Sequence, residues 1–260
     1  MTRRNLIATS ALAASFAPSG AAAKAARSII EIRVAKLRNG SDNQAQRLGE
    51  FIGKAAVPAL KRAGAGPVGA FSSLIAEDSP FLLVVTSYPT LSAMESAAQK
   101  MASDKEYTEA ARKFYSAPGL PFQRMECSLL RGFDSMPNIE VPPTEGRKTS
   151  RVFEIRTYES NTSLTLYRKM RMFDDGEIAI FRRTGLLPVF FGETIVGRNM
   201  PNLTYMVAFD DLAARENNWR TFANDPEWLK LRATPGLSDA EIVSNISNCL
   251  VRPMPFSDIR

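Results

Sequence analysis

The chain has 260 residues, enough for two domains of ordinary size, and its 45% hydrophobic and 23% charged residues are typical of a globular protein. It contains no histidine, which excludes histidine-dependent acid–base catalysis and histidine-ligated zinc or haem. The formal net charge of +6 arises from basic residues scattered among acidic ones, so we expect no nucleic-acid partner. The two cysteines are too few for a structural zinc site, and no Asp-rich loop indicates a hard cation, so we expect neither a metal nor another cofactor.

Residues 1–26 have the layout of an export signal. Arg3 and Arg4 precede a short apolar stretch that ends near Ala17, and an Ala-x-Ala cleavage site follows at residues 21–23. The arginine pair favours a twin-arginine signal, whereas a Sec signal or a retained N-terminal helix are the alternatives. The apolar stretch is too short to span a bilayer. We therefore expect an exported, periplasmic or otherwise extracytoplasmic protein without a transmembrane segment.

The rest of the chain repeats itself at a spacing of 121 residues, which becomes 123 in the first predicted strand. Matches spread over so many positions at one spacing indicate a duplication. We predict a first domain at residues 28–135, a linker at 136–150 that contains two adjacent prolines, and a second domain at 151–256. The matched pairs include Glu31 with Glu154, Arg33 with Arg156, Gly64 with Gly185, Pro67 with Pro188 and Asp104 with Asp225.

The elements of the second domain follow the order β-α-β-β-α-β. Gly185 stands where a helix ends, and Asp225 precedes a proline where a helix begins again. We therefore predict an α+β fold of two tandem ferredoxin-like domains, each an antiparallel sheet with its helices on one face. The predicted strands are 152–158, 188–196, 203–209 and 249–252, and the predicted helices are 165–183 and a segment after Asp211 that restarts at 226.

An ordered series of motifs in the second domain resembles the NIPSNAP family. The series comprises Phe153–Tyr158, Gly197 with Asn199–Pro201, Leu203–Met206, Phe209–Glu216, Trp219, Phe222 and Asp225–Trp228. The first domain looks like a degenerate relative, in which Ala35 replaces Tyr158, Ala98 replaces Trp219 and Tyr107 replaces Trp228. The resemblance implies a dimeric α+β barrel, here a pseudo-dimer formed by one chain. It implies no particular reaction, because the family has no well-defined common chemistry.

Alternate residues of the strand at 152–158 point to opposite faces of the sheet. We assign its apolar residues, Phe153 and Ile155, to the face that the helices cover, and its polar residues to the barrel lumen. The resulting ligand-binding candidates are Glu154, Arg156, Tyr158 and, on a neighbouring strand, Tyr205.

Two interpretations of this polar face remain open. In the functional one, Arg156 clamps an anionic or carbonyl-bearing ligand and Tyr158 donates a hydrogen bond to it. In the structural one, Glu154 and Arg156 form an ion pair that fixes the strand register. The recurrence of the pair as Glu31 and Arg33, in the copy that lacks the tyrosine, favours the structural interpretation.

Two functions follow, and no catalytic residue is predicted for either. The first is non-catalytic binding of a small molecule or a protein partner, with a homo-oligomer also open. The alternative is a cofactor-independent enzyme that acts on a small organic substrate in the lumen. An enclosed lumen pocket that contains the polar candidates would favour a ligand, whereas a packed lumen would favour a scaffold. Whether Cys127 and Cys249 form a disulfide depends on how closely their strands approach.

Overall fold

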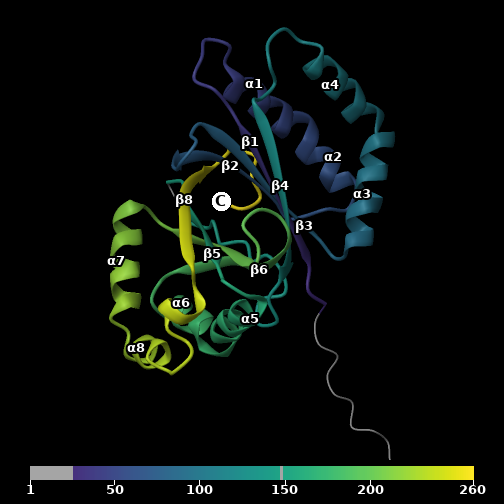
Figure 1. Ribbon diagram of the computed structural model, residues 1–260. Helices are drawn as coiled ribbons and strands as arrows, with labels where there is room; N and C mark the ends of the chain where they lie inside the picture. Colours follow the sequence, from purple (N-terminus) through teal and green to yellow (C-terminus); the bar gives the residue numbers. More distant parts are fainter. Residues whose placement is uncertain (1–25, 147–148) are drawn as a thin grey trace, which may run out of the picture.

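The computed structural model describes residues 26–146 and 149–260, and its eight strands close into one antiparallel barrel (Figure 1). The predicted export signal lies almost entirely outside the described residues. Around the barrel the strands follow the order β1-β3-β2-β8-β5-β7-β6-β4. The strands are β1 (Ile29–Lys36), β2 (Val68–Ile75), β3 (Phe81–Tyr88), β4 (Arg124–Gly132), β5 (Val152–Glu159), β6 (Leu187–Val196), β7 (Asn202–Phe209) and β8 (Asn245–Pro253).

The first four strands are neighbours in the barrel, and so are the last four. We call β1–β4 with their helices the N-terminal half, and β5–β8 with theirs the C-terminal half. The halves join where β4 pairs with β6 and where β2 pairs with β8. Each half places its strands in the same spatial order, β4-β1-β3-β2 in one and β8-β5-β7-β6 in the other. An α+β architecture with a closed barrel is therefore present.

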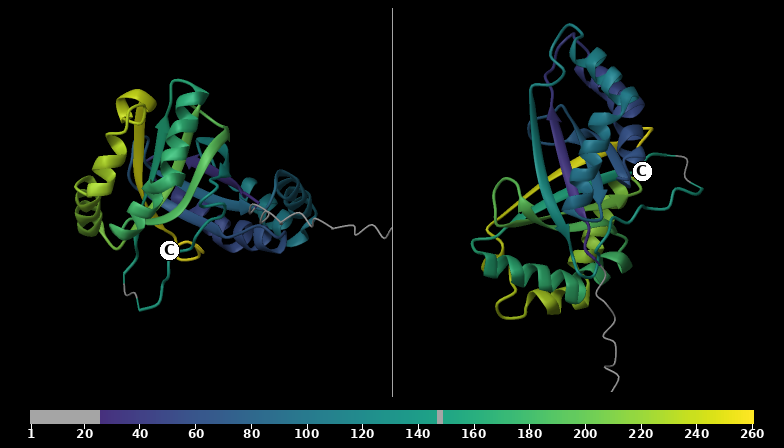
Figure 2. Two further views of the ribbon diagram at one scale, coloured as in Figure 1. Left: turned by 90° about the horizontal axis from the view of Figure 1, so that it is seen from below. Right: turned by 90° about the vertical axis from the view of Figure 1, so that its right-hand side faces the viewer.

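The helices of the two halves lie on opposite sides of the barrel (Figures 1 and 2). The long first helix of each half contains one π-helical turn, at Ile52–Ala56 and at Phe173–Glu177. The predicted helix at 165–183 is thus present, with this wider turn in its middle. The helices are α1 (Gln44–Phe51), η1 (Ile52–Ala56), α2 (Val57–Arg62), α3 (Leu91–Ser103) and α4 (Lys105–Tyr115), then α5 (Ser163–Met172), η2 (Phe173–Glu177), α6 (Ile178–Arg183), α7 (Leu212–Ala223), α8 (Pro226–Arg232) and α9 (Asp239–Ile242).

In both halves the same polar contact ties the first helix to a later one, α4 in the N-terminal half and α8 in the C-terminal half. Asp104 caps α4 and Asp225 caps α8, each by accepting backbone N–H groups of the first turn. Arg62 at the end of α2 donates to Asp104 over 2.8 Å, and Arg183 at the end of α6 donates to Asp225 over 2.5 Å. In each half, one aspartate therefore both caps a helix and joins that helix to the first one.

The interior of the barrel is a packed apolar core. One cluster of buried side chains includes residues from all eight strands, which can meet only inside a closed barrel. Phe71 of the N-terminal half and Phe153 of the C-terminal half lie edge to face there, with ring centroids 5.2 Å apart. An eight-stranded barrel has room inside for little more than its own side chains. The barrel interior therefore holds the two halves together.

The assignment of the two faces of β5 was wrong. Phe153 and Ile155 point into the barrel interior, where they join the cluster that includes all eight strands. Glu154, Arg156 and Tyr158 point outward, toward the helices of the C-terminal half. The alternation along the strand was predicted correctly, but closure of the barrel leaves both faces covered, so apolar residues did not reveal which face the helices occupy.

Candidate functional site

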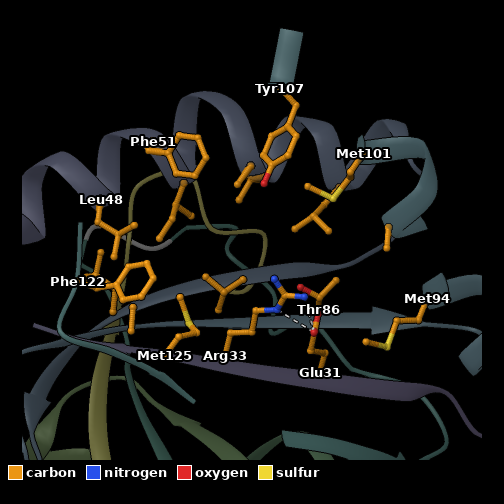
Figure 3. A pocket seen from close by; sticks show the side chains of 18 of the residues that line it. Glu31, Arg33, Leu48, Phe51, Thr86, Met94, Met101, Tyr107, Phe122 and Met125 are labelled. Atoms are coloured by element: carbon orange, nitrogen blue, oxygen red, sulfur yellow. Dashed lines mark hydrogen bonds and ion pairs between the residues drawn. The ribbon is translucent and has the colours of Figure 1, made fainter. Parts of the chain in front are cut away.

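A pocket lies between the sheet and the helices of the N-terminal half (Figure 3). Its cavity volume is about 150 Å³, which is the size of a cavity that accepts benzene. β1 and β3 form its floor, and α1, η1, α2, α3 and α4 form its walls. In Figure 3, Glu31 and Arg33 face Phe51 and Tyr107 across the pocket. Most of the lining is apolar, with the polar groups gathered on the floor.

Glu31 and Arg33 form an ion pair on this floor. Nε of Arg33 donates to Oε1 of Glu31 over 2.8 Å, and the hydroxyl of Tyr88 donates to Oε2 over 3.2 Å. The thiol of Cys127 lies 3.5 Å from Oε1. Glu31 is 2% exposed, whereas 56% of the Arg33 side chain is exposed. The carboxylate is therefore buried at the base of the pocket, while the guanidinium presents much of its surface to the open space.

The charges on this floor are mutually stabilised. Burial disfavours the charged form of Arg33, but the neighbouring Glu31 carboxylate outweighs it and raises the pKa of the guanidinium. Burial, and then the negative charge of Glu31, raise the pKa of the Tyr88 phenol well above its ordinary value. Tyr88 therefore remains a neutral hydrogen-bond donor.

The corresponding pair of the C-terminal half, Glu154 and Arg156, is enclosed. Glu154 is fully buried and accepts hydrogen bonds from Arg156 at 2.9 Å, from Arg215 at 2.7 and 2.9 Å, from the Trp219 indole at 2.8 Å and from Asn248 at 2.9 Å. The guanidinium carbon of Arg156 lies 4.8 Å from the Trp219 ring centroid, and only 18% of the Arg156 side chain is exposed. Trp219 thus covers the pair.

Strand register and helix position establish which residues of the two halves correspond. Arg33 stands opposite Val84 in the β1–β3 ladder, and Arg156 stands opposite Tyr205 in the β5–β7 ladder. Three large aromatic side chains of the C-terminal half are consequently replaced by small ones. The replacements are Ala35 for Tyr158, Val84 for Tyr205 and Ala98 for Trp219. Ala98 and Trp219 correspond because Ala98 is the eighth residue of α3 and Trp219 is the eighth residue of α7. Lost aromatic volume opens the pocket.

The structure brings all four predicted site residues together, but beneath the helices and not in the lumen. The hydroxyl of Tyr205 donates to that of Tyr158 over 3.1 Å, and Arg156 approaches the Tyr158 hydroxyl at 3.4 Å. Tyr205 is fully buried and Tyr158 nearly so, within a core that includes Phe173 and Phe181. These tyrosines fill the space that a ligand would need.

A buried ion pair near these tyrosines was not predicted. Nζ of Lys169 lies 3.1 Å from a carboxylate oxygen of Glu177 and 3.5 Å from Asp239, and both Lys169 and Glu177 are almost fully buried. The ammonium also lies 4.8 Å from the centroid of the Phe173 ring. No sequence pattern marked the pair, because its partners are eight residues apart across the π-helical turn.

The pocket of the N-terminal half was also missed, although the sequence contained a signal for it. Ala35 and Ala98 stand where the other copy has Tyr158 and Trp219, and this loss of volume was visible in the alignment of the two copies. The interpretation of the first domain as a degenerate relative does not by itself predict a pocket. Both small residues line the cavity that the lost side-chain volume leaves.

Two further observations concern the residues that the structure describes. Those residues contain no group of three or more Cys, Asp or Glu side chains arranged to hold a metal ion. None of the described helices is long and apolar enough to cross a membrane. Cys127 and Cys249 are both free thiols.

Comparison with solved structures shows the fold over most of the chain. A "putative monooxygenase" from Fusobacterium nucleatum subsp. nucleatum superposes with a TM-score of 0.57 and 9% identity, covering 88% of this chain and 93% of that one. Another protein with this name, from Lactobacillus acidophilus, gives a TM-score of 0.54 and 8% identity, covering 87% and 94%. At these identities the likeness concerns the fold alone.

The family comparison concerns the C-terminal half. The NIPSNAP family model matches residues 153–258. A NIPSNAP family protein from Agrobacterium tumefaciens is 21% identical, with a TM-score of 0.38, over 44% of this chain and 97% of that one. No curated protein matches the chain. The protein therefore carries a NIPSNAP domain at residues 153–258, the family that the sequence motifs predicted.

Proposed function

We propose that this protein binds a small organic molecule in the pocket of its N-terminal half, between the β1–β3 sheet and helices α1–α4. The observation that carries the proposal is the contrast between the halves. Both retain a buried glutamate paired with an arginine, but only the N-terminal half leaves the arginine accessible beside a cavity of about 150 Å³. Apolar walls with a few convergent polar groups are typical of ligand sites.

The outer wall of the pocket is compatible with ligand entry. No residue of α4 is fully buried, and the helix is held to the first helix by stacking of Phe114 on Phe51, whose ring centroids are 4.5 Å apart. In the C-terminal half, α8 is instead anchored by the buried Trp228. A helix with few buried contacts opens at low cost in free energy.

Blocking the pocket tests the proposal. Ala98→Trp places in the N-terminal half the side chain that fills the C-terminal half, and Gln99→Trp adds the same bulk to an exposed neighbour outside the pocket. Proteins purified in parallel would be denatured, and the released small molecules identified by mass spectrometry. We expect a compound present with wild type and Gln99→Trp but absent with Ala98→Trp. Equal amounts in all three samples would exclude this pocket.

A second candidate function is catalysis in the same pocket. Glu31 is a buried carboxylate that lines the pocket, so it could accept a proton from a bound substrate. Two proteins with this fold bear the name "putative monooxygenase". Incubation of the co-purified compound with the protein would reveal a change in its mass if a reaction occurs, and Glu31→Gln would abolish that change.

We also propose an architecture and a cellular location for the protein. The common strand order of the halves and their matching caps support two tandem ferredoxin-like domains that form a dimeric α+β barrel as a pseudo-dimer.

Export through a twin-arginine signal is supported by Arg3 and Arg4 ahead of the apolar stretch. Replacing both arginines by lysine should retain the protein in the cytoplasm, and unchanged export would contradict the proposal.

A further inference from the structure

The C-terminal half contains a planar aromatic group in the position that the pocket leaves open. The Trp219 indole lies against the Arg156 guanidinium, and its N–H donates to Oε2 of Glu154. Position 219 corresponds to Ala98 in the other half. The protein therefore shows which kind of group a glutamate–arginine pair at this place on the sheet accommodates: a flat ring above the arginine, with an N–H directed at the carboxylate.

The glutamate of the N-terminal half has fewer donors than its counterpart. Glu154 accepts hydrogen bonds from two side chains of α7, Arg215 and Trp219. The corresponding residues of α3 are Met94 and Ala98, neither of which can donate through its side chain. Among the described residues, Oε2 of Glu31 has the single donor Tyr88, at 3.2 Å. A carboxylate has about four acceptor positions, so Glu31 retains capacity for a donor that enters the pocket.

The charge of the floor restricts the ligand further. Glu31 and Arg33 neutralise each other within the pocket. An anionic ligand would approach the buried carboxylate of Glu31, and a cationic ligand would displace Arg33 from it. Either would leave an uncompensated charge in an apolar cavity, which is costly. An uncharged molecule avoids both penalties.

We infer that the pocket recognises an uncharged planar aromatic molecule that carries a hydrogen-bond donor, an N–H or an O–H, which it directs at Glu31 while its ring lies against Arg33. Met94, Met101 and Phe51 would cover the remainder of the ring. Methionine side chains adapt readily to aromatic surfaces. This inference rests on the proposed function and specifies its ligand class.

Two ligands of equal shape test the role of the donor. Indole has an N–H where indene has a CH₂ group, so they differ at one atom of the five-membered ring. Calorimetric titration of the full chain should show that indole binds more tightly, although indene is the more apolar. A hydrogen bond to a charged group contributes about a tenfold change in affinity or more. Equal affinities of the wild-type protein for the two ligands, or tighter binding of indene, would by themselves overturn the inference.

Variants then locate the interaction. Glu31→Gln should lower the ratio of indole affinity to indene affinity about tenfold, because a neutral amide accepts more weakly than a carboxylate. Ala98→Trp should abolish binding of both ligands, and Gln99→Trp should leave the affinities of both unchanged.

Indole-2-carboxylate tests the charge argument, since it retains the N–H and adds an anion. It should bind at least tenfold more weakly than indole. Tighter binding of the carboxylate would contradict the restriction to uncharged ligands.

The two levels of the proposal fail in different ways. If indole and indene bind equally well and both are lost in Ala98→Trp, the pocket binds small molecules but does not select a donor, and only the inference fails. If neither ligand binds, and the Ala98→Trp protein co-purifies with the same compounds as wild type, the proposed function fails with it. Titration of the wild-type and Gln99→Trp proteins in parallel controls for the added tryptophan.

Discussion

The indole nitrogen of Trp219 donates a hydrogen bond to the carboxylate of Glu154 over 2.8 Å. This bond joins α7 to β5 and covers a charge that would otherwise face open space. At the corresponding position of α3 the side chain is that of Ala98, and the Arg33 guanidinium below it is left accessible while Glu31 stays buried. Ala98 is one of the three positions at which a small side chain replaces an aromatic one, so its exchange for tryptophan tests what this position contributes to closing the half.

Removal of the indole should create a second pocket. Trp219→Ala is expected to lower the free energy of unfolding by about 3 kcal/mol, the cost of a large cavity and a lost hydrogen bond. Added indole should restore part of this loss. The measurement is the rise in melting temperature that indole causes in the double variant Ala98→Trp/Trp219→Ala. The control is the single variant Ala98→Trp, in which both halves are closed. An equal rise in the two proteins would show that no second pocket forms.

Arg156 should contribute to stability through its buried partner. Glu154 is fully buried and Arg156 is largely enclosed, so Arg156→Ala should cost about 3 kcal/mol in urea denaturation. Arg182→Ala is the matched control, because Arg182 forms a bidentate pair with Glu140 in which both side chains are about half exposed. That control should cost less than about 1 kcal/mol. Similar losses from the two variants would contradict a structural role for Arg156.

The buried pair of Lys169 and Glu177 should be costly to break but not to replace. Burial raises the pKa of Glu177, so its carboxylate depends on the ammonium at 3.1 Å. Lys169→Met should lower the free energy of unfolding by about 3 kcal/mol at neutral pH. Adding Glu177→Leu should recover most of this loss, since apolar residues of similar volume replace buried ion pairs well. If the double variant is as unstable as the single one, the pair has another role.

Glu154 should make the protein sensitive to acid. Burial acts to raise the pKa of Glu154, but hydrogen bonds from Arg215, Asn248 and Trp219 outweigh it, so the pKa lies below its ordinary value of 4.5. A carboxyl with a lowered folded-state pKa stabilises the fold above its unfolded-state pKa, and this contribution is lost as the pH falls. The stability difference between wild type and Glu154→Gln should thus be largest near pH 7 and should shrink below about pH 4.5. Denaturation series at several pH values measure it, and a difference that grows in acid would refute this sign.

The two thiols should react at different rates. Burial raises the pKa of Cys249 to about 11, and this residue packs against the barrel core. Burial and the Glu31 carboxylate also raise the pKa of Cys127, but its side chain is exposed. With a thiol reagent at about pH 8, we expect Cys127 to react first and Cys249 only when the protein unfolds. Cys127→Ser should remove the fast phase, and its persistence in that variant would exclude the assignment.

Much of the fold was predictable from local sequence. The order of strands and helices follows from residue periodicity and from caps such as Asp225 and Gly185, whose effects extend over only a few residues. The NIPSNAP motifs of the C-terminal half predicted the family. The alternation along β5 likewise follows from the geometry of one strand.

Only the tertiary structure decided which face of β5 is inside the barrel and which half is open. Alternation separates Glu154 from Phe153, but the choice between core and helix layer depends on how two sheets close and on donors such as Arg215 and Trp219, which lie more than 60 positions away. A cavity depends on the volumes of side chains that meet from several elements, so the loss of aromatic rings at Ala35 and Ala98 became a pocket only once α3 and β1 were placed against each other.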